Sequence, residues 1–164
     1  MSFKTVDLDK VSDKFFKIAE GQNKIRVISE PVPLWVSFDK ETKKAKKYLD
    51  EGIAKTDLQA KKRYCMWVID RADGKVKMAE FGTSVMRQIQ ILALDDDYGF
   101  DSIPPYDLKI TRAGGGMETK YTVTPMPKSD LSEADGLLLL NIESVETFLK
   151  KQPGLVTEAE SIPF

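Results

Sequence analysis

The stretch from residue 106 to residue 125 constrains the fold more than any other part of this 164-residue sequence. Apolar side chains recur at every second position on both sides of three consecutive glycines, namely Tyr106, Leu108, Ile110, Tyr121 and Val123. Because the side chains of a strand alternate between two faces, this pattern predicts a half-buried antiparallel hairpin. The three glycines supply the positive φ angles that a short turn needs. The exposed face then carries Lys109 and Lys120, with Arg112 at the tip, which suits a polyanion.

A second hairpin and a helix follow from the same kind of pattern. Residues 63–71 and 75–81 are strand-like runs, and the Asp73-Gly74 pair between them is a strong turn signal. Apolar residues occupy both sides of the 63–71 run, which predicts a strand that is covered on both faces or contacts a ligand on one of them. From residue 83 to residue 94 the apolar residues recur at helical spacing. A hairpin followed by one helix is therefore expected in the middle of the chain.

Two shorter alternating runs, residues 24–28 and 34–38, predict strands near the start of the chain. In the first, Lys24 and Arg26 are expected to face outward. In the second, the residues expected to face the core are Leu34, Val36 and Phe38. Trp35 is then expected to face solvent beside the basic strand.

The most basic stretch is residues 39–63, where nine Lys and Arg residues stand against five Asp and Glu residues. It holds few apolar residues, so it predicts a long mobile loop with a short helix over residues 53–60. Loops of this length in small domains are usually functional or disordered. Helical spacing returns at residues 142–151, and Pro153-Gly154 ends that helix.

The order of elements favours a mainly β fold with minor α content. Five strands with a helix before the final pair outline an OB-fold, a small Greek-key barrel, here with one or two helices. A β-sandwich or an α+β sheet would give a similar pattern. We expect a loose N-terminal segment at residues 1–14, the folded domain at 15–152 and a disordered acidic tail at 153–164.

Charge is distributed unevenly along the chain, although the formal net charge is only -1. From Asp130 onward seven acidic residues stand against two lysines, a net of -5, so the first 129 residues carry +4. The single cysteine, Cys65, excludes an internal disulfide, and the absence of histidine excludes a histidine base or zinc ligand. No apolar run approaches the length of a membrane span.

The basic strands are interleaved with aromatic residues, as in proteins that grip single strands through phosphates and stacked bases. The candidate DNA-binding residues are Lys24, Arg26, Trp35, Lys62, Arg63, Tyr64, Lys109, Arg112 and Lys120. Tyr64 and Trp67 lie on opposite faces of one strand, so at most one of them can stack on bases. Trp35, which is expected to face solvent, is the best candidate for stacking. An ordinary solvated sheet face would carry similar lysines and arginines.

An aspartate cluster offers an alternative from the class of enzymes. Residues 95–97 and Asp101 supply carboxylates that would suit Mg²⁺ in a nuclease. No lysine or histidine stands in register with them, so a solvated loop is the simpler interpretation. We expect a protein that is not an enzyme and that needs no cofactor or metal. A non-enzymatic structural or adaptor role is a further alternative.

Four segments together resemble the single-stranded DNA-binding proteins of tailed phages: KIRVIS at residues 24–29, VIDRADGKVK at 68–77, Gly99 with the later Tyr106-Asp107, and the glycine hairpin. The resemblance covers roughly residues 15–135. It implies an OB-fold that binds single-stranded DNA without sequence preference in replication, recombination or repair. Some of these phage proteins have cysteine pairs for zinc in the loop after the second strand. That loop is lysine-rich here, so no zinc is implied.

The last residues, Glu158, Glu160, Ile162, Pro163 and Phe164, are similar to the tip of bacterial single-stranded DNA-binding proteins. An acidic peptide that ends in a ring suits an apolar pocket with a basic rim on another protein. The similarity implies recruitment of a polymerase, a helicase–primase or a recombinase. It also implies action in the cytoplasm of an infected bacterial host, with no membrane partner.

Overall fold

One sheet runs through the residues that the computed structural model describes, 14–157. Its eight strands are β1 (Gly21–Val27), β2 (Val32–Asp39), β3 (Lys44–Tyr48), β4 (Lys61–Asp70), β5 (Lys75–Phe81), β6 (Tyr106–Ala113), β7 (Lys120–Lys128) and β8 (Leu155–Val156). The pairing order is β7-β6-β1-β4-β2-β3-β8, and β5 pairs with β4. The mainly β class is confirmed, whereas the predicted number of five strands is wrong.

Strand β4 is the centre of the sheet because three strands pair with it. Its first half pairs with β2, its second half pairs with β1, and β5 runs antiparallel along its other edge. Strand β1 also pairs with β6, which forms the predicted hairpin with β7. At the start of the turn, Gly114 has φ +80° and lies against the carbonyl of Glu118, so a side chain does not fit there.

Four α-helices occur in the same part of the chain: α2 (Glu51–Ala54), α3 (Thr83–Ala93), α4 (Glu133–Leu139) and α5 (Val145–Lys150). The helices predicted over residues 83–94 and 142–151 are confirmed. None of the described helices is long and apolar enough to cross a membrane. The prediction of a long loop over residues 39–63 is wrong, because the segment contains β3. A short helix is present in it as predicted, but α2 begins and ends earlier than the expected range of 53–60. Strand β3 is held by its pairing with β2 on one side and β8 on the other.

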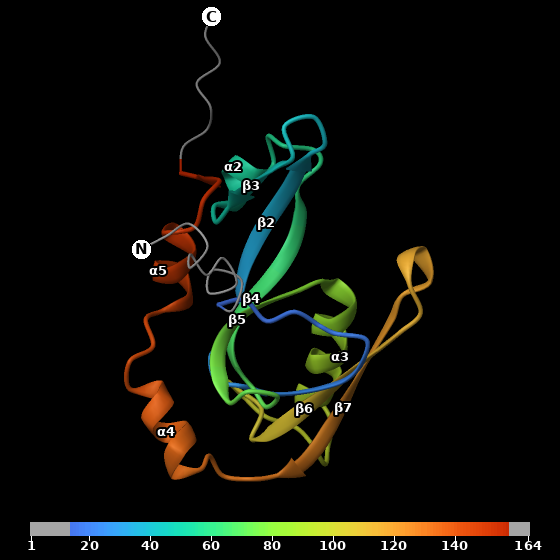
Figure 1. Cartoon of the computed structure of the whole chain (residues 1–164), viewed down its shortest axis with the longest axis vertical. Helices are drawn as coiled ribbons and strands as arrows, with labels where there is room; N and C mark the ends of the chain where they lie inside the picture. The colour runs from blue at the N-terminus through green and yellow to red at the C-terminus, as the bar shows by residue number, and fades with distance from the viewer. Residues whose placement is uncertain (1–13, 158–164) are drawn as a thin grey trace, which may run out of the picture.

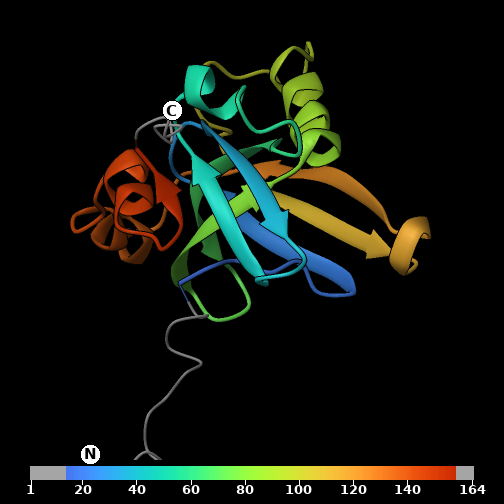
Figure 2. The same ribbon diagram turned by 90° about the horizontal axis from the view of Figure 1, so that it is seen from above.

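The sheet separates two apolar clusters, and the helices cover opposite sides of the β4–β5 hairpin (Figure 1, Figure 2). We call the side on which α3 packs the α3 face, and the other side the α5 face. Met66 and Val68 of β4 join the cluster of the α3 face, whereas Cys65 and Trp67 join that of the α5 face. The prediction that this strand is covered on both faces is therefore confirmed.

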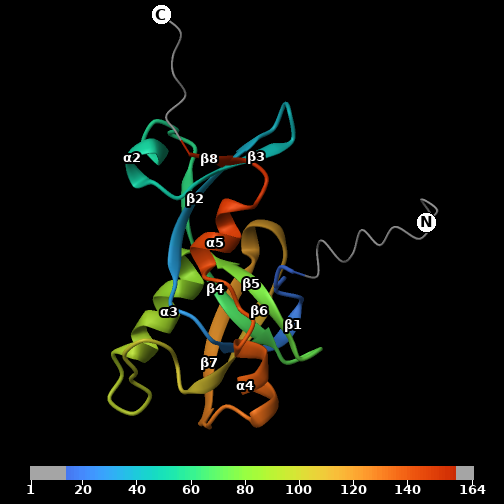
Figure 3. The same ribbon diagram turned by 90° about the vertical axis from the view of Figure 1, so that its left-hand side faces the viewer.

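The chain returns to the sheet after α5, where β8 pairs in parallel with β3 (Figure 3). Gly154 makes this approach possible: it has φ +84°, and a side chain there would collide with the carbonyl of Ala45. The backbone N–H of Lys47 donates to the carbonyl of Gly154 over 2.9 Å. A disordered tail was predicted from residue 153 onward, but Leu155 and Val156 form strand β8 of the sheet. Residues 158–164, which carry the predicted partner-binding side chains, lie outside the described part.

Candidate nucleic-acid interface

The register of the strands divides the nine candidate residues between the two faces. Trp35 is opposite Lys62, and Lys62 is two residues from Tyr64 on β4. These three side chains share the α3 face, because Tyr64 packs at the edge of its apolar cluster. Arg112 is opposite Tyr121, which also borders that cluster. The α3 face thus collects four of the nine candidates.

Trp35, Lys62 and Tyr64 form a compact group, which we call the Trp35 cluster. The ammonium nitrogen of Lys62 lies 5.4 Å from the ring centroid of Trp35 and 5.4 Å from that of Tyr64. Both rings are half-buried and Lys62 is exposed. A cation held over two ring faces suits a strand of nucleic acid, because a phosphate is attracted to the ammonium while a base stacks on a ring.

A hollow of about 1080 Å³ opens on the same face, between the β2–β3 hairpin and the segment that follows α2. Ser37 and Tyr48 line it, and the register places both on the side of Trp35, since Tyr48 is opposite Trp35. Lys40 and Lys46 also line it. The Trp35 cluster and the hollow therefore lie on the same face, and Ser37 of the hollow is two residues from Trp35 on β2.

Asp57 also lines this hollow. Its Oδ2 atom accepts hydrogen bonds from the hydroxyl groups of Ser37, over 2.5 Å, and Tyr48, over 2.9 Å. The bond from Ser37 is the largest of several that hold the pKa of Asp57 below its ordinary value. Asp57 is therefore an ionised hydrogen-bond acceptor at neutral pH.

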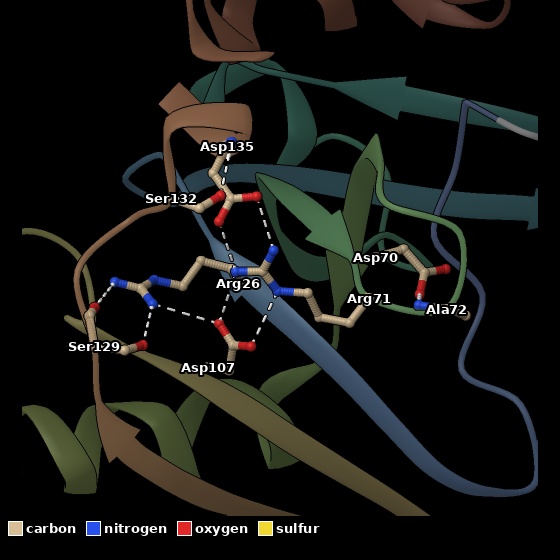
Figure 4. Close-up of polar contacts among 8 residues, drawn as sticks. All are labelled: Arg26, Asp70, Arg71, Ala72, Asp107, Ser129, Ser132 and Asp135. Carbon is tan, nitrogen blue, oxygen red and sulfur yellow. Dashed lines mark hydrogen bonds and ion pairs between the residues drawn. The ribbon is translucent and has the colours of Figure 1, made fainter. Parts of the chain in front are cut away.

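Arg26 does not face solvent, contrary to the prediction from alternation. Only 4% of the residue is exposed. Its guanidinium group lies 3.4 Å from Oδ1 of Asp107 and donates to the side chain and carbonyl of Ser129 at 3.0 and 2.7 Å (Figure 4). The partners lie on β6 and after β7, so Arg26 ties the sheet together and is not available to DNA.

Arg63 and Arg112 are both engaged with the protein. Arg63 is on the α5 face, where its guanidinium group lies 3.3 Å from the carboxylate of Glu80 and donates to the carbonyl of the same residue. Arg112, on the α3 face, donates to the carbonyl of Ile18 over 3.3 Å. Arg63 is thereby separated from its neighbours Lys62 and Tyr64, which point to the opposite side of β4.

Lys24, Lys109 and Lys120 lie on the α5 face of the sheet. Lys24 and Lys109 are directly opposite each other on β1 and β6. Lys120 shares their face because Thr124, four residues further along β7, is opposite Lys109. A DNA strand bound over the Trp35 cluster would have to pass around the edge of the sheet to contact these three lysines.

Trp67 is a core residue, as its position on the face opposite Tyr64 suggests. Its ring packs edge-on against Phe148 with 4.8 Å between centroids, and its indole N–H donates to the carbonyl of Glu143. Cys65 is buried on the same face, and burial raises the pKa of its thiol to about 12. Both side chains are buried, and Trp67 is 8% exposed.

The aspartate cluster after α3 shapes a turn. Oδ1 of Asp95 accepts from the backbone N–H groups of Asp97 and Tyr98, over 2.7 and 3.0 Å, and these bonds lower the pKa of Asp95. Within residues 14–157 no three Asp, Glu or Cys side chains are grouped to hold a metal ion.

Comparison with known proteins gives one similarity. The chain is 30% identical over 101 residues to a protein of Escherichia phage T5 named "Probable ssDNA-binding protein". The aligned region is 60% of this chain and 35% of the phage protein, so the chain spans about a third of that relative's length. No protein-family description matches the chain, and no solved structure matches it.

The hollow was not anticipated from the sequence, because its walls come from a segment predicted to be a loop. Ser37, Lys46 and Asp57 approach one another only after β3 pairs with β2. The sequence gives one indication of the hollow, namely the polar Ser37 near the end of the largely apolar strand β2. Alternation alone does not predict that the hydroxyl group of Ser37 contacts Asp57.

Proposed function

We propose that this protein binds single-stranded DNA without strong sequence preference, with the Trp35 cluster as the centre of the interface. The observation that carries the proposal is Lys62 held 5.4 Å from both the Trp35 and the Tyr64 ring on one open face. The similarity to the phage T5 protein named for single-stranded DNA supports it. The bound strand would lie over the α3 face, with bases on the rings and phosphates near Lys62.

We further propose that the sheet is an expanded OB-fold. The supporting observation is the pairing order: β1 lies between β4 and β6, β4 pairs with β5, β6 pairs with β7, and α3 connects the two hairpins. These five strands correspond in order to the five of an OB-fold. Strands β2 and β3 then lie in the connection between the first two barrel strands, and β8, which follows α5 in the chain, pairs with β3. In OB-folds that loop and the loop of the last hairpin contact oligonucleotides.

Titration with oligo-dT tests the binding directly. Tryptophan fluorescence should fall on addition of the oligonucleotide, because a stacked base quenches Trp35. Trp35→Phe should remove most of this signal, whereas Trp67→Phe should keep it, since Trp67 is covered by Phe148. Absence of binding in a direct assay such as fluorescence anisotropy of labelled oligo-dT would overturn the proposal.

The salt dependence of the same titration measures the phosphate contacts. Three to five contacts predict a slope of roughly -2 to -3.5 for log K against log salt concentration, since each contact on a single strand contributes about -0.7. A slope near zero would mean that phosphates are not part of the interface.

The biological role that we propose is to coat transient single strands in replication, recombination or repair of phage DNA in the infected host. In this role the protein is not an enzyme. The end of the chain, Glu158 to Phe164, would recruit a polymerase, a helicase–primase or a recombinase. Its acids would also compete with DNA for the basic side chains at low salt.

A variant that ends at Thr157 separates these two roles. We expect its affinity for oligo-dT to be unchanged or up to several-fold higher at low ionic strength, with the difference vanishing at high salt. Capture of the replication or recombination partner should be lost. Weaker binding of oligo-dT by the shortened chain would contradict the proposed competition.

A further inference from the structure

The hollow beside the Trp35 cluster has the features of a subsite for a single flat ligand. Its volume is about 1080 Å³, slightly above the usual range of small-molecule pockets, so a single base would fill only part of it. Two exposed apolar side chains line it: Phe38 is 55% exposed and Leu58 is 98% exposed. Neither is needed to fill the core, so both are free to contact the faces of a ring.

The polar side of the hollow is acceptor-rich. Oδ2 of Asp57 receives the hydroxyl hydrogens of Ser37 and Tyr48, and Oδ1 receives the backbone N–H of Gln59 over 3.1 Å. An ionised carboxylate has about four acceptor positions, so one remains on Oδ1. Both hydroxyl groups donate their hydrogens to Asp57, so these three side chains offer acceptors to a ligand. Lys46 lines the same hollow, and its charge also lowers the pKa of Asp57.

The hollow lies on the path of the strand proposed above. Ser37 follows Trp35 by two residues on β2, and Lys40, which is exposed, also lines the hollow. If a base next to Trp35 unstacks and enters the hollow, the phosphate of its nucleotide would lie near a lysine that lines the hollow. Unstacked bases of single strands are commonly held between side chains and read at their hydrogen-bonding edges.

We propose that the hollow holds one unstacked nucleobase of the bound strand and prefers bases with an exocyclic amino group. A carboxylate accepts from N4 of cytosine, a known pairing of acidic side chains with bases. Thymine and uracil present the O4 acceptor at the same position, and its lone pairs would face those of Asp57. The inference rests on the proposed binding of single-stranded DNA, and adds a base preference at one position of an otherwise unselective interface.

Oligo-dC and oligo-dU of equal length test the preference at neutral pH, because these bases differ mainly in the amino group and the carbonyl at position 4. The wild-type protein should bind oligo-dC about fivefold more tightly, as expected for one net hydrogen bond. Asp57→Asn should bring the ratio close to one, since an amide offers a donor as well as an acceptor.

Asp50→Asn is the matched control. It removes one negative charge from the same segment, does not line the hollow, and keeps a side chain that caps α2. The ratio should remain fivefold in this variant. Phe38→Ala should weaken both oligonucleotides to a similar extent, because ring contact does not depend on the amino group. This second variant leaves the hydrogen bonds of Asp57 intact if Asp57→Asn fails to fold.

The outcomes are distinct. Binding of both oligonucleotides with a ratio of one in the wild-type protein, or an unchanged ratio in Asp57→Asn, overturns the base preference and leaves the proposed function standing. Binding of neither oligonucleotide overturns the proposed function and the subsite together. An altered ratio in Asp50→Asn would show that the preference comes from charge and not from the hollow.

Discussion

Trp35→Ala is expected to weaken binding of oligo-dT by roughly 5- to 150-fold, because one base–aromatic stack contributes about 1–3 kcal/mol. The loss should fall toward the upper end of this range, since Lys62 would also lose one of the two rings that position it. Fluorescence anisotropy of a labelled oligonucleotide measures the affinity. Trp35→Phe should recover much of it, because a smaller ring still stacks.

The double variant Lys24→Ala/Lys109→Ala provides the control for this prediction. It removes two positive charges from the α5 face, whereas Trp35→Ala removes none from the α3 face. If DNA lies over the Trp35 cluster, the double variant should change affinity by only a few-fold, through the general field of the protein. A larger loss in the double variant than in Trp35→Ala would place the interface on the α5 face. Thermal unfolding of each variant checks that the fold is intact.

Both hairpins could be predicted from the sequence because their signals are local. Alternation with period two and a glycine turn specify which side chains share a face, and the register of β6 and β7 agrees with that prediction. The opposite orientations of Tyr64 and Trp67 follow from the same rule. What these patterns do not specify is which face receives a helix, because that depends on segments far along the chain.

Arg26 shows why alternation fails for a buried charge. Alternation along β1 predicts that the Arg26 side chain points away from the apolar cluster of the α3 face, and it does. The α5 face at that point is not solvent, however, because the segment around Ser129 and Asp107 covers it. These partners are 103 and 81 residues away in the sequence. No local pattern reports a contact of that range.

Strand β3 was missed for a related reason. Its sequence, KAKKY, has almost no apolar alternation, so propensity and pattern both favour a loop. It is a strand because β2 and β8 supply hydrogen-bonding partners on its two edges. The candidate hollow depends on this pairing. The chemistry of residues 37, 46 and 57 was therefore visible in the sequence, but their proximity was not.

Acidic residues are in excess from Asp130 onward, and part of that charge is paired inside the fold. Asp135 is a buried member of α4, and its carboxylate binds Arg71. Glu143 pairs with Lys151. Glu158 and Glu160 lie outside the described residues, and they belong to the segment for which competition with DNA is proposed.

Arg71→Ala is expected to destabilise the folded protein by about 2–4 kcal/mol, because removing one partner of a largely buried ion pair leaves charge uncompensated. Arg71 donates two hydrogen bonds to Asp107, of 3.0 and 3.1 Å, and two to Asp135, of 2.9 and 3.0 Å (Figure 4). Its side chain is 27% exposed and that of Asp135 is 10% exposed, so the cost should be lower than for a fully buried pair. Urea unfolding measures the difference.

Two variants separate the network from ordinary surface charge. Lys151→Ala breaks an ion pair with Glu143 whose lysine is 64% exposed, and it should change stability by no more than about 0.5 kcal/mol. Arg71→Lys keeps the charge but loses the planar fork that bridges two carboxylates, so it should lie between wild type and Arg71→Ala. An Arg71→Ala variant as stable as Lys151→Ala would mean that the network does not hold α4 against the sheet.

The destabilisation should also depend on pH in a defined direction. The hydrogen bonds from Arg71 are the largest cause of the lowered pKa of Asp135 in the folded protein. A carboxyl group whose pKa is lower in the folded than in the unfolded state adds stability above its unfolded pKa, about 4. That contribution is lost as the pH falls through the folded value. The stability difference between wild type and Arg71→Ala should therefore be largest near neutral pH and shrink below about pH 4. A difference that stays constant on acidification would show that Arg71 stabilises α4 by packing and not by charge.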